Sequence, residues 1–130
     1  MTPAAKRILV IENEQIVAHD LNNLLKRLGY APLGPATTGR EAIQLAEQTK
    51  PDLILMDVKL NGGMDGVEAS HEIVRNRTVP VVYLTGYPGT FICSPWEMVH
   101  PYLCLAKPFS ERGVQAAIES ALGVANGKPN

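Results

Sequence analysis

The amino-acid sequence predicts an α/β fold, in which helices cover both faces of a doubly wound, five-stranded parallel sheet and so form three layers. Two observations support this fold class. Strand-like and helix-like segments alternate along the whole chain, which is typical of parallel sheets built from strand–helix–strand units. The strand-like segments are also short and continuously apolar, as strands are when helices bury both of their faces.

The N-terminal half is expected to contain two strands and two helices. Arg7–Ile11 is rich in branched apolar residues, as buried strands are, and Ala31–Gly34 is a weaker second strand. Between them, apolar residues at helical spacing predict a helix that ends at Gly29. Thr38 and Glu41 have the spacing of a capping box, which opens a second helix.

The C-terminal half continues the alternation. Strands are expected at Leu53–Met56, Val79–Leu84 and Leu103–Ala106. Asp65 and Glu68 have capping-box spacing after a glycine-rich loop, and they open a third helix. Ser110 is expected to cap the last helix, whose apolar stripe consists of Val114, Ala117, Ile118 and Ala121.

The segment 87–102, between the fourth and fifth strands, leaves room only for a short fourth helix. Pro88, Pro95 and Pro101 interrupt it, and Ser94 followed by Pro95 is typical of a helix start. Its large apolar side chains either fill the core beside the fourth strand or form a docking surface, and both explanations are open at this point. These side chains are Phe91, Trp96, Met98 and Tyr102.

Length and composition exclude several classes of protein. The chain has 130 residues, which fits one domain, expected at residues 1–122 with a polar tail at 123–130. A net charge of −1 with scattered Lys and Arg argues against direct nucleic-acid binding, and no apolar run is long enough to span a membrane. Cys93 and Cys104 lie in apolar segments and are expected to be buried free thiols in a reducing cytoplasm.

Polar side chains stand at the carboxyl ends of four of the predicted strands. Glu12 and Asn13 follow the first strand, Asp57 the third, Thr85 the fourth and Lys107 the fifth. Open parallel sheets bind ligands outside these strand ends. Each residue taken singly has an ordinary explanation as a turn or capping residue, but their coincidence at one edge favours a functional site.

Two neighbouring carboxylates, on Glu12 and Asp57, repel each other, and a divalent cation relieves that repulsion. Mg²⁺ prefers oxygen ligands, and the Asn13 side chain and the backbone carbonyl of Lys59 can supply two more. We therefore expect a Mg²⁺ site made by these four residues.

A carboxylate in this setting can act as a nucleophile toward a phosphoryl group. The charge on the phosphoryl oxygens is then neutralised by the metal ion, the Lys107 ammonium and the Thr85 hydroxyl, together with backbone N–H groups around Gly86. Asp57, Thr85 and Lys107 are thus the candidate catalytic residues, with Asp57 as the phosphoryl acceptor.

Four segments of the sequence carry a family resemblance: ILVIENE, DLILMDVKLNGGMDGVEA, VPVVYLTGYPG and LAKPFSE. In this order and spacing, they resemble the receiver domains of two-component response regulators, and the resemblance extends from Arg7 to Leu122. It implies a flavodoxin-like fold with strand order 2-1-3-4-5. By position it makes Asp57 the phosphoacceptor, Glu12 and Asn13 the acidic metal pair, Thr85 the switch hydroxyl and Lys107 the phosphate-pairing lysine.

The resemblance also implies a role in a cytoplasmic phosphorelay. A histidine kinase or phosphotransfer protein donates the phosphoryl group, and the domain catalyses only its own phosphorylation and dephosphorylation, with Mg²⁺. Phosphorylation is then expected to change the surface made by the fourth helix, the fifth strand and the fifth helix. A homodimer or a downstream protein is expected to form through this surface.

The sequence departs from the family pattern at several positions. Asn13 stands where the family usually has a metal-binding Asp, and Cys104 where many members carry a Tyr or Phe. The loop after Asp57 reads Asn-Gly-Gly and lacks the usual Pro. The segment YLTGY is similar in part to the Phe-Ala-Thr-Gly motif of single-domain receivers of stress phosphorelays, although Pro88 replaces the expected tyrosine.

Two other functions compete with the phosphorylated switch. The first is a pseudo-receiver, which has the same fold but binds proteins without being phosphorylated, and Asn13 favours it. The second is a flavin- or nucleotide-binding enzyme. The run Glu12-Asn13-Glu14 disfavours that class, because it would repel a phosphate where such proteins have a glycine-rich loop.

Overall fold

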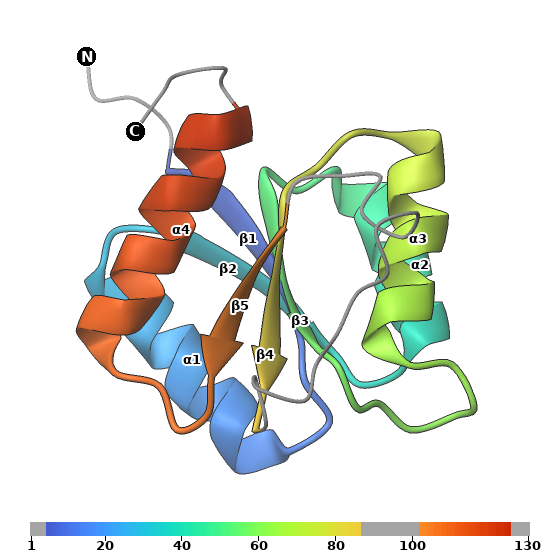
Figure 1. Ribbon diagram of the computed structural model, residues 1–130, viewed down its shortest axis with the longest axis horizontal. Coiled ribbons are helices and arrows are strands. Elements are labelled where there is room, and N and C mark those ends of the chain that lie inside the picture. Colours follow the sequence, from blue (N-terminus) through green and yellow to red (C-terminus); the bar gives the residue numbers. More distant parts are fainter. Residues whose placement is uncertain (1–4, 87–101, 126–130) are drawn as a thin grey trace.

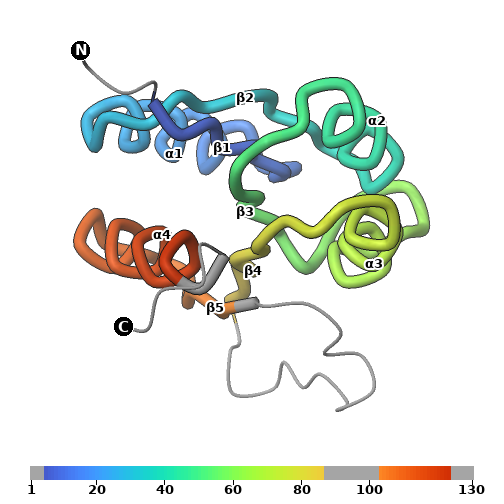
Figure 2. Tube along the Cα trace, turned by 90° about the horizontal axis from the view of Figure 1, so that it is seen from above, coloured from blue at the N-terminus to red at the C-terminus, as the bar shows by residue number. Residues whose placement is uncertain are grey.

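The computed structural model describes residues 5–86 and 102–125, which form a five-stranded parallel sheet between two layers of helices (Figures 1 and 2). The strand order is β2-β1-β3-β4-β5, and every neighbouring pair is parallel, so the order implied by the resemblance is confirmed. Helices α1 and α4 cover one face of the sheet, and α2 and α3 cover the other.

Strands and helices follow the predicted alternation. The strands are β1 (Arg7–Ile11), β2 (Ala31–Ala36), β3 (Leu53–Asp57), β4 (Val81–Thr85) and β5 (Tyr102–Ala106). The helices are α1 (Gln15–Arg27), α2 (Gly39–Thr49), α3 (Gly66–Asn76) and α4 (Glu111–Ala125). The short fourth helix expected after Ser94 lies outside the described residues, so the predicted fifth helix is labelled α4. No helix in the described ranges is long and apolar enough to cross a membrane.

Two strand boundaries differ from the sequence expectation by two residues, and prolines explain both, whereas β3, the end of β4 and the start of β5 differ by one residue. β2 continues across Pro35 to Ala36, which is tolerated because β2 is an edge strand with sheet hydrogen bonds on one side only. β4 starts at Val81 rather than Val79, because Pro80 has no N–H group to donate to the neighbouring strand.

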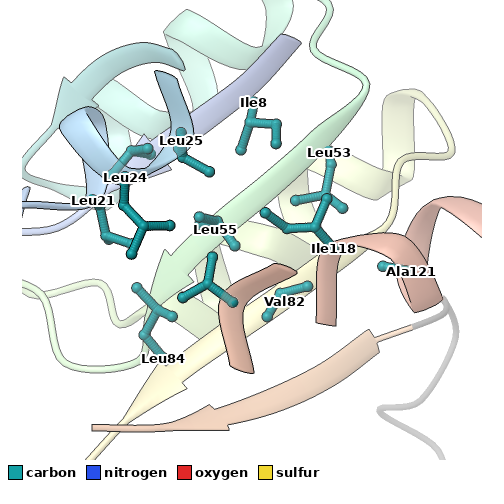
Figure 3. Packing of buried hydrophobic residues seen from close by; sticks show 12 residues of the cluster. Ile8, Leu21, Leu24, Leu25, Leu53, Leu55, Val82, Leu84, Ile118 and Ala121 are labelled. Atoms are coloured by element: carbon teal, nitrogen blue, oxygen red, sulfur yellow. The ribbon is translucent and has the colours of Figure 1, made fainter. Parts of the chain in front are cut away.

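Side chains of the central strands pack into two hydrophobic clusters, one on each face of the sheet. One cluster joins the sheet to α1 and α4, and it includes Leu21, Leu55 and Ile118 (Figure 3). The other joins the sheet to α2 and α3. Burial on both faces explains why β1, β3 and β4 read as continuous apolar runs. The packed layers fix the strand ends that carry the polar residues.

The caps predicted for α2 and α3 form to different extents. At α3, Asp65 and Glu68 complete a capping box, in which each backbone N–H donates to the other side chain, at 2.8 and 3.1 Å. At α2, the backbone N–H of Glu41 donates to the Thr38 hydroxyl, but the Glu41 carboxylate accepts from Thr37. The reciprocal contact at α2 therefore lies one residue before the predicted one.

The last strand and helix bear out one prediction and correct another. The Ser110 hydroxyl caps α4 by accepting a backbone hydrogen bond of 3.0 Å, as expected. Cys104, expected to be buried, is exposed. Its neighbours Leu103 and Leu105 pack against the α1/α4 cluster, so alternation along β5 points Cys104 to the opposite face of this edge strand. Cys93 lies outside the described residues.

Candidate functional site

Four strand ends converge on a cleft at the carboxyl edge of the sheet. The cleft has a volume of about 340 Å³. It is lined by residues that follow or end β1, β3, β4 and β5, namely Asn13, Glu14, Asp57, Val58, Lys59, Thr85, Gly86 and Lys107. The structure thus brings together the residues that the sequence predicted for the site, with the Glu12 carboxylate within 3 Å of Lys107.

Two carboxylates are buried at the base of this cleft. Glu12 is completely buried and Asp57 is 4% exposed, because each stands at the end of a strand enclosed by helices. Burial is the main cause that raises the pKa of Asp57 from 3.8 to about 6, and the adjacent Glu12 is the second. A backbone N–H from Lys59 donates to Oδ1 of Asp57 at 3.2 Å and partly offsets this rise.

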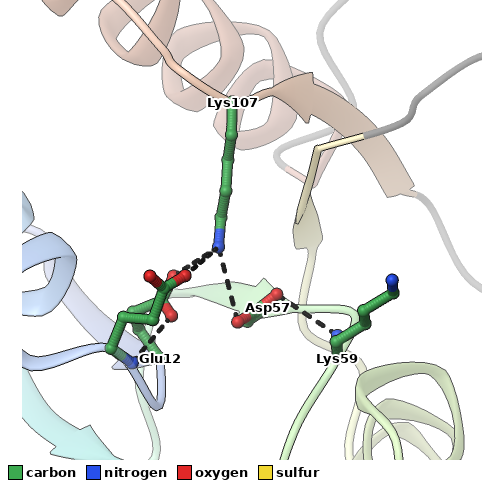
Figure 4. A network of polar contacts seen from close by, with 5 residues as sticks. Glu12, Asp57, Lys59 and Lys107 are labelled. Atoms are coloured by element: carbon green, nitrogen blue, oxygen red, sulfur yellow. Dashed lines mark hydrogen bonds and ion pairs between the residues drawn. The ribbon is translucent and has the colours of Figure 1, made fainter.

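Lys107 supplies the positive charge that these carboxylates require. Its Nζ lies 2.9 Å from Oε1 of Glu12, 3.4 Å from Oδ2 of Asp57 and 3.7 Å from Oε1 of the exposed Glu14 (Figure 4). Burial acts to lower the pKa of Lys107, but contact with Glu12 and the charge of Asp57 outweigh it and leave this pKa raised. The lysine is therefore held as an ammonium ion across the cleft. Its backbone N–H donates to the Thr85 carbonyl at 2.8 Å, which ties β5 to β4 at the site.

The Asn13 amide bridges the two carboxylates. The orientation of this amide is assigned from its hydrogen-bonding surroundings. With its nitrogen facing the carboxylates, Nδ2 donates to Oε2 of Glu12 at 3.2 Å and to Oδ2 of Asp57 at 3.0 Å. The opposite orientation would place the amide oxygen against two carboxylate oxygens, with no donor between them. Asn13 therefore acts as a hydrogen-bond donor toward the acids.

The start of α3 packs directly against the backbone of Asp57. The Gly66 N–H donates to the Val58 carbonyl at 2.8 Å. A Cβ built on Gly66 would lie 2.0 Å from the carbonyl oxygen of Asp57, so only glycine fits at this position. No pattern in the sequence indicates this contact, because it depends on how α3 docks on β3.

The donor set at the base of the cleft fits a hard divalent cation. Oε1 of Glu12 is buried and has only the Lys107 ammonium to balance it, without a hydrogen bond of ordinary geometry among the described residues. Glu12 and Asp57 offer carboxylate oxygens, and Asn13 carries an amide oxygen, all of the kind that Mg²⁺ prefers. Over residues 5–86 and 102–125, no three acidic, His or Cys side chains gather as a metal site.

Comparison with known proteins relates the chain to one family. The family model of the response regulator receiver domain matches residues 8–119. The Phyllosphere-induced regulator PhyR of Methylorubrum extorquens is 39% identical over 119 residues, which cover 91% of this chain and 44% of PhyR. The Transcriptional regulatory protein PdtaR of Mycobacterium tuberculosis is 38% identical over 117 residues, which cover 90% of this chain and 57% of PdtaR. The chain spans about half the length of these curated relatives.

A solved structure of a receiver domain also bears on the cleft. The receiver domain of the sensor histidine kinase PA1611 from Pseudomonas aeruginosa has a TM-score of 0.79 and 28% sequence identity to this chain. The match covers 92% of this chain and 99% of that domain. That domain was solved with a magnesium ion coordinated in its active-site cleft.

Proposed function

This chain belongs to the response regulator receiver domain family, and from that premise we propose that it is a phosphorelay switch that accepts a phosphoryl group on Asp57. The observation that carries the proposal is the environment of this one carboxylate. Asp57 ends β3 at the base of the cleft, with Glu12 and Asn13 on one side and Lys107 within 3.4 Å. A nucleophile and the groups that neutralise its product thus share one cleft.

The proposed step joins an Asp57 carboxylate oxygen to the phosphorus of a phosphohistidine on the donor protein. The P–N bond of the donor breaks, its electron pair returns to the imidazole, and the imidazole takes up a proton from solvent. Because the pKa of Asp57 is about 6, most of this carboxylate is ionised and nucleophilic near neutral pH. The Lys107 ammonium and the Thr85 hydroxyl then bind phosphoryl oxygens.

We propose Mg²⁺ as the cofactor of this step. Its ligands are Glu12, Asp57, the amide oxygen of Asn13 and the backbone carbonyl of Lys59. Bound there, the ion supplies positive charge against the phosphoryl oxygens. The magnesium ion in the PA1611 receiver domain supports this assignment by likeness of fold.

Receiver domains act as signalling modules in two-component systems, and the proposed catalysis here is confined to phosphorylation and dephosphorylation of the domain itself. Residues 1–122 form the proposed receiver unit, and the proposed location is the cytoplasm, where a histidine kinase or phosphotransfer protein acts as donor. The readout surface comprises the fourth helix expected within 87–102, β5 and α4. A second copy or a downstream protein binds there in this proposal.

A second candidate function is that of a pseudo-receiver, which binds a partner without phosphorylation. Asn13 favours it, because its amide can donate one hydrogen bond to each of the two carboxylates without a metal ion. PhyR from Bartonella quintana, solved as an anti-anti-sigma factor, has a TM-score of 0.83 and 31% identity over 97% of this chain and 51% of PhyR. A relative of this receiver is thus described as an anti-anti-sigma factor, a name that refers to protein regulation.

The phosphoryl analogue beryllofluoride separates the two functions. Backbone amide NMR spectra of the uniformly ¹⁵N-labelled chain are recorded in the presence of Mg²⁺, before and after addition of beryllofluoride. The switch predicts saturable shifts at Asp57, Thr85 and Lys107 that disappear in Asp57→Asn. A pseudo-receiver predicts the same spectrum with and without the analogue, and that outcome would reject the phosphorelay role.

A further inference from the structure

Asn13 is a neutral side chain whose amide lies within hydrogen-bond distance of both buried carboxylates. Its Nδ2 donates to Glu12 at 3.2 Å and to Asp57 at 3.0 Å, so one amide group links two strand ends. An Asp at this position could only accept hydrogen bonds, and it would add a negative charge beside two others. The amide therefore lowers the repulsion that the metal-free cleft would otherwise contain.

In the orientation assigned from these hydrogen bonds, the amide oxygen points away from the two carboxylates, whose charge a cation would neutralise. An oxygen is the only atom of Asn that binds Mg²⁺. Both groups cannot face the carboxylates at once, because the amide nitrogen and oxygen lie on opposite sides of one planar group.

We infer that Asn13 is a two-position latch: its NH₂ group closes the metal-free site onto Glu12 and Asp57, and the amide turns over to offer its oxygen when a divalent cation binds. The inference rests on the proposed function only in taking the cleft as a divalent-cation site. Cation binding must then break two charge-assisted hydrogen bonds that an Asp at position 13 could not make. The latch keeps the cleft ordered without metal and sets a higher cation concentration for its opening.

Lys107 holds the closed state together with Asn13. Its Nζ lies 2.9 Å from Oε1 of Glu12, while Asn13 donates to Oε2 of the same carboxylate, and both residues contact Oδ2 of Asp57. Both oxygens of Glu12 are thus engaged in the closed state, although Oε1 lacks a hydrogen bond of ordinary geometry. Only the Asn13 contacts reverse their polarity on rotation, so the latch function belongs to that residue.

The direct test follows the side-chain NH₂ of Asn13 by NMR in the full chain. Its hydrogen exchange is compared with that of Asn76, an exposed residue that ends α3. In EDTA, we expect the Asn13 NH₂ to exchange at least roughly tenfold more slowly than that of Asn76. Saturating Mg²⁺ should remove this protection. Equal exchange of the two side chains in EDTA, or protection of Asn13 that persists with Mg²⁺, would overturn the inference.

Two substitutions separate the latch from a merely structural role. Asn13→Asp removes the donor and supplies a charged oxygen, so Mg²⁺ should bind roughly ten- to a hundredfold more tightly, while the thermal midpoint in EDTA falls. Asn13→Ala removes donor and oxygen together, so the midpoint should fall without any gain in Mg²⁺ affinity. Tighter Mg²⁺ binding in both variants, or in neither, would contradict the latch.

Phosphorylation is measured separately in the same proteins, with acetyl phosphate as the donor. If acetyl phosphate does not phosphorylate the protein but the Asn13 NH₂ group is protected as expected, the proposed phosphorelay is rejected and the latch stands. If Asp57 is phosphorylated but the Asn13 NH₂ group is not protected from exchange in EDTA, the latch is rejected and the phosphorelay stands.

Discussion

The ammonium nitrogen of Lys107 lies 2.9 Å from Oε1 of Glu12, and this ion pair joins the end of β5 to the end of β1 across the cleft. The Glu12 side chain is completely buried and that of Lys107 is 19% exposed. A buried ion pair of this kind stabilises mainly by preventing an uncompensated charge, so removal of one partner costs more than removal of both.

Replacement of Lys107 should therefore destabilise the protein strongly. Lys107→Met leaves two buried carboxylates without a cation, and only neutral donors such as the backbone N–H groups of Glu14 and Lys59 remain beside them. We expect the free energy of unfolding in EDTA to fall by about 2–4 kcal/mol. Urea denaturation near neutral pH measures this change. Lys59→Met, at an exposed position beside the same cleft, is the matched control and should cost less than about 0.5 kcal/mol.

The double variant Lys107→Met with Glu12→Gln checks the cause. Because the second substitution removes the uncompensated charge, it should restore part of the stability lost in Lys107→Met. A double variant whose loss equals the sum of the two single losses would show that the ion pair is not the reason.

Asp57 should make stability fall with rising pH in the metal-free protein. The pKa of Asp57 is raised from 3.8 to about 6, so between these values the folded protein holds a proton that the unfolded chain has released. The contribution of Asp57 to the free energy of unfolding is therefore greatest below about pH 4. It declines between about pH 4 and pH 6 and is constant above that range. Asp57→Asn removes this penalty.

The stabilising effect of Asp57→Asn should accordingly grow by about 1–3 kcal/mol from the acid to the neutral side of this window. Thermal unfolding of both proteins in EDTA across that range gives the difference directly. A difference that stays constant with pH would mean that burial does not raise this pKa.

Gly66 should tolerate no side chain. Gly66→Ala places a Cβ 2.0 Å from the Asp57 carbonyl oxygen and 2.9 Å from Cγ of Met56, so α3 or the end of β3 must shift. We expect a loss of about 2–3 kcal/mol in the free energy of unfolding, with Mg²⁺ binding weakened as Asp57 moves. Gly86→Ala is the control, because none of the described residues has an atom within 4 Å of its Cβ position. Similar losses for both variants would mean that the close packing on Asp57 does not matter.

Trp96 should report the change that follows phosphorylation. The only tryptophan stands in the segment 87–102, which the sequence predicts to shift when Thr85 moves toward the phosphoryl group. Its fluorescence should change on addition of beryllofluoride and Mg²⁺, and Asp57→Ala should abolish the change. An unchanged signal, with unchanged amide hydrogen exchange across the segment, would remove it from the mechanism.

Much of the fold could be predicted from short-range patterns. Continuous apolar runs identified β1, β3 and β4, because burial on both faces removes the polar alternation. Local hydrogen bonds made the caps at Asp65 and Ser110 predictable, since they depend on spacing alone. The strand order came from the family resemblance, because no local pattern says which strands become neighbours.

Long-range geometry explains what the sequence did not show. The site residues were predictable in kind, since strand ends meet at one edge of a parallel sheet. The orientation of the Asn13 amide was not, because it depends on two acceptors from different strands. The exposure of Cys104 depends on which face of the edge strand it occupies, and the packing of Gly66 on Asp57 depends on helix docking.

Mass spectrometry after incubation with acetyl phosphate and Mg²⁺ tests the central claim most directly. The intact wild-type chain should gain one phosphoryl group, and peptide mapping should place it on Asp57. Asp57→Ala, checked for folding by its thermal transition, should gain none. Uptake of the group by a folded Asp57→Ala protein to the same extent, or no uptake by the wild-type chain, would contradict the assignment of Asp57 as the phosphoryl acceptor.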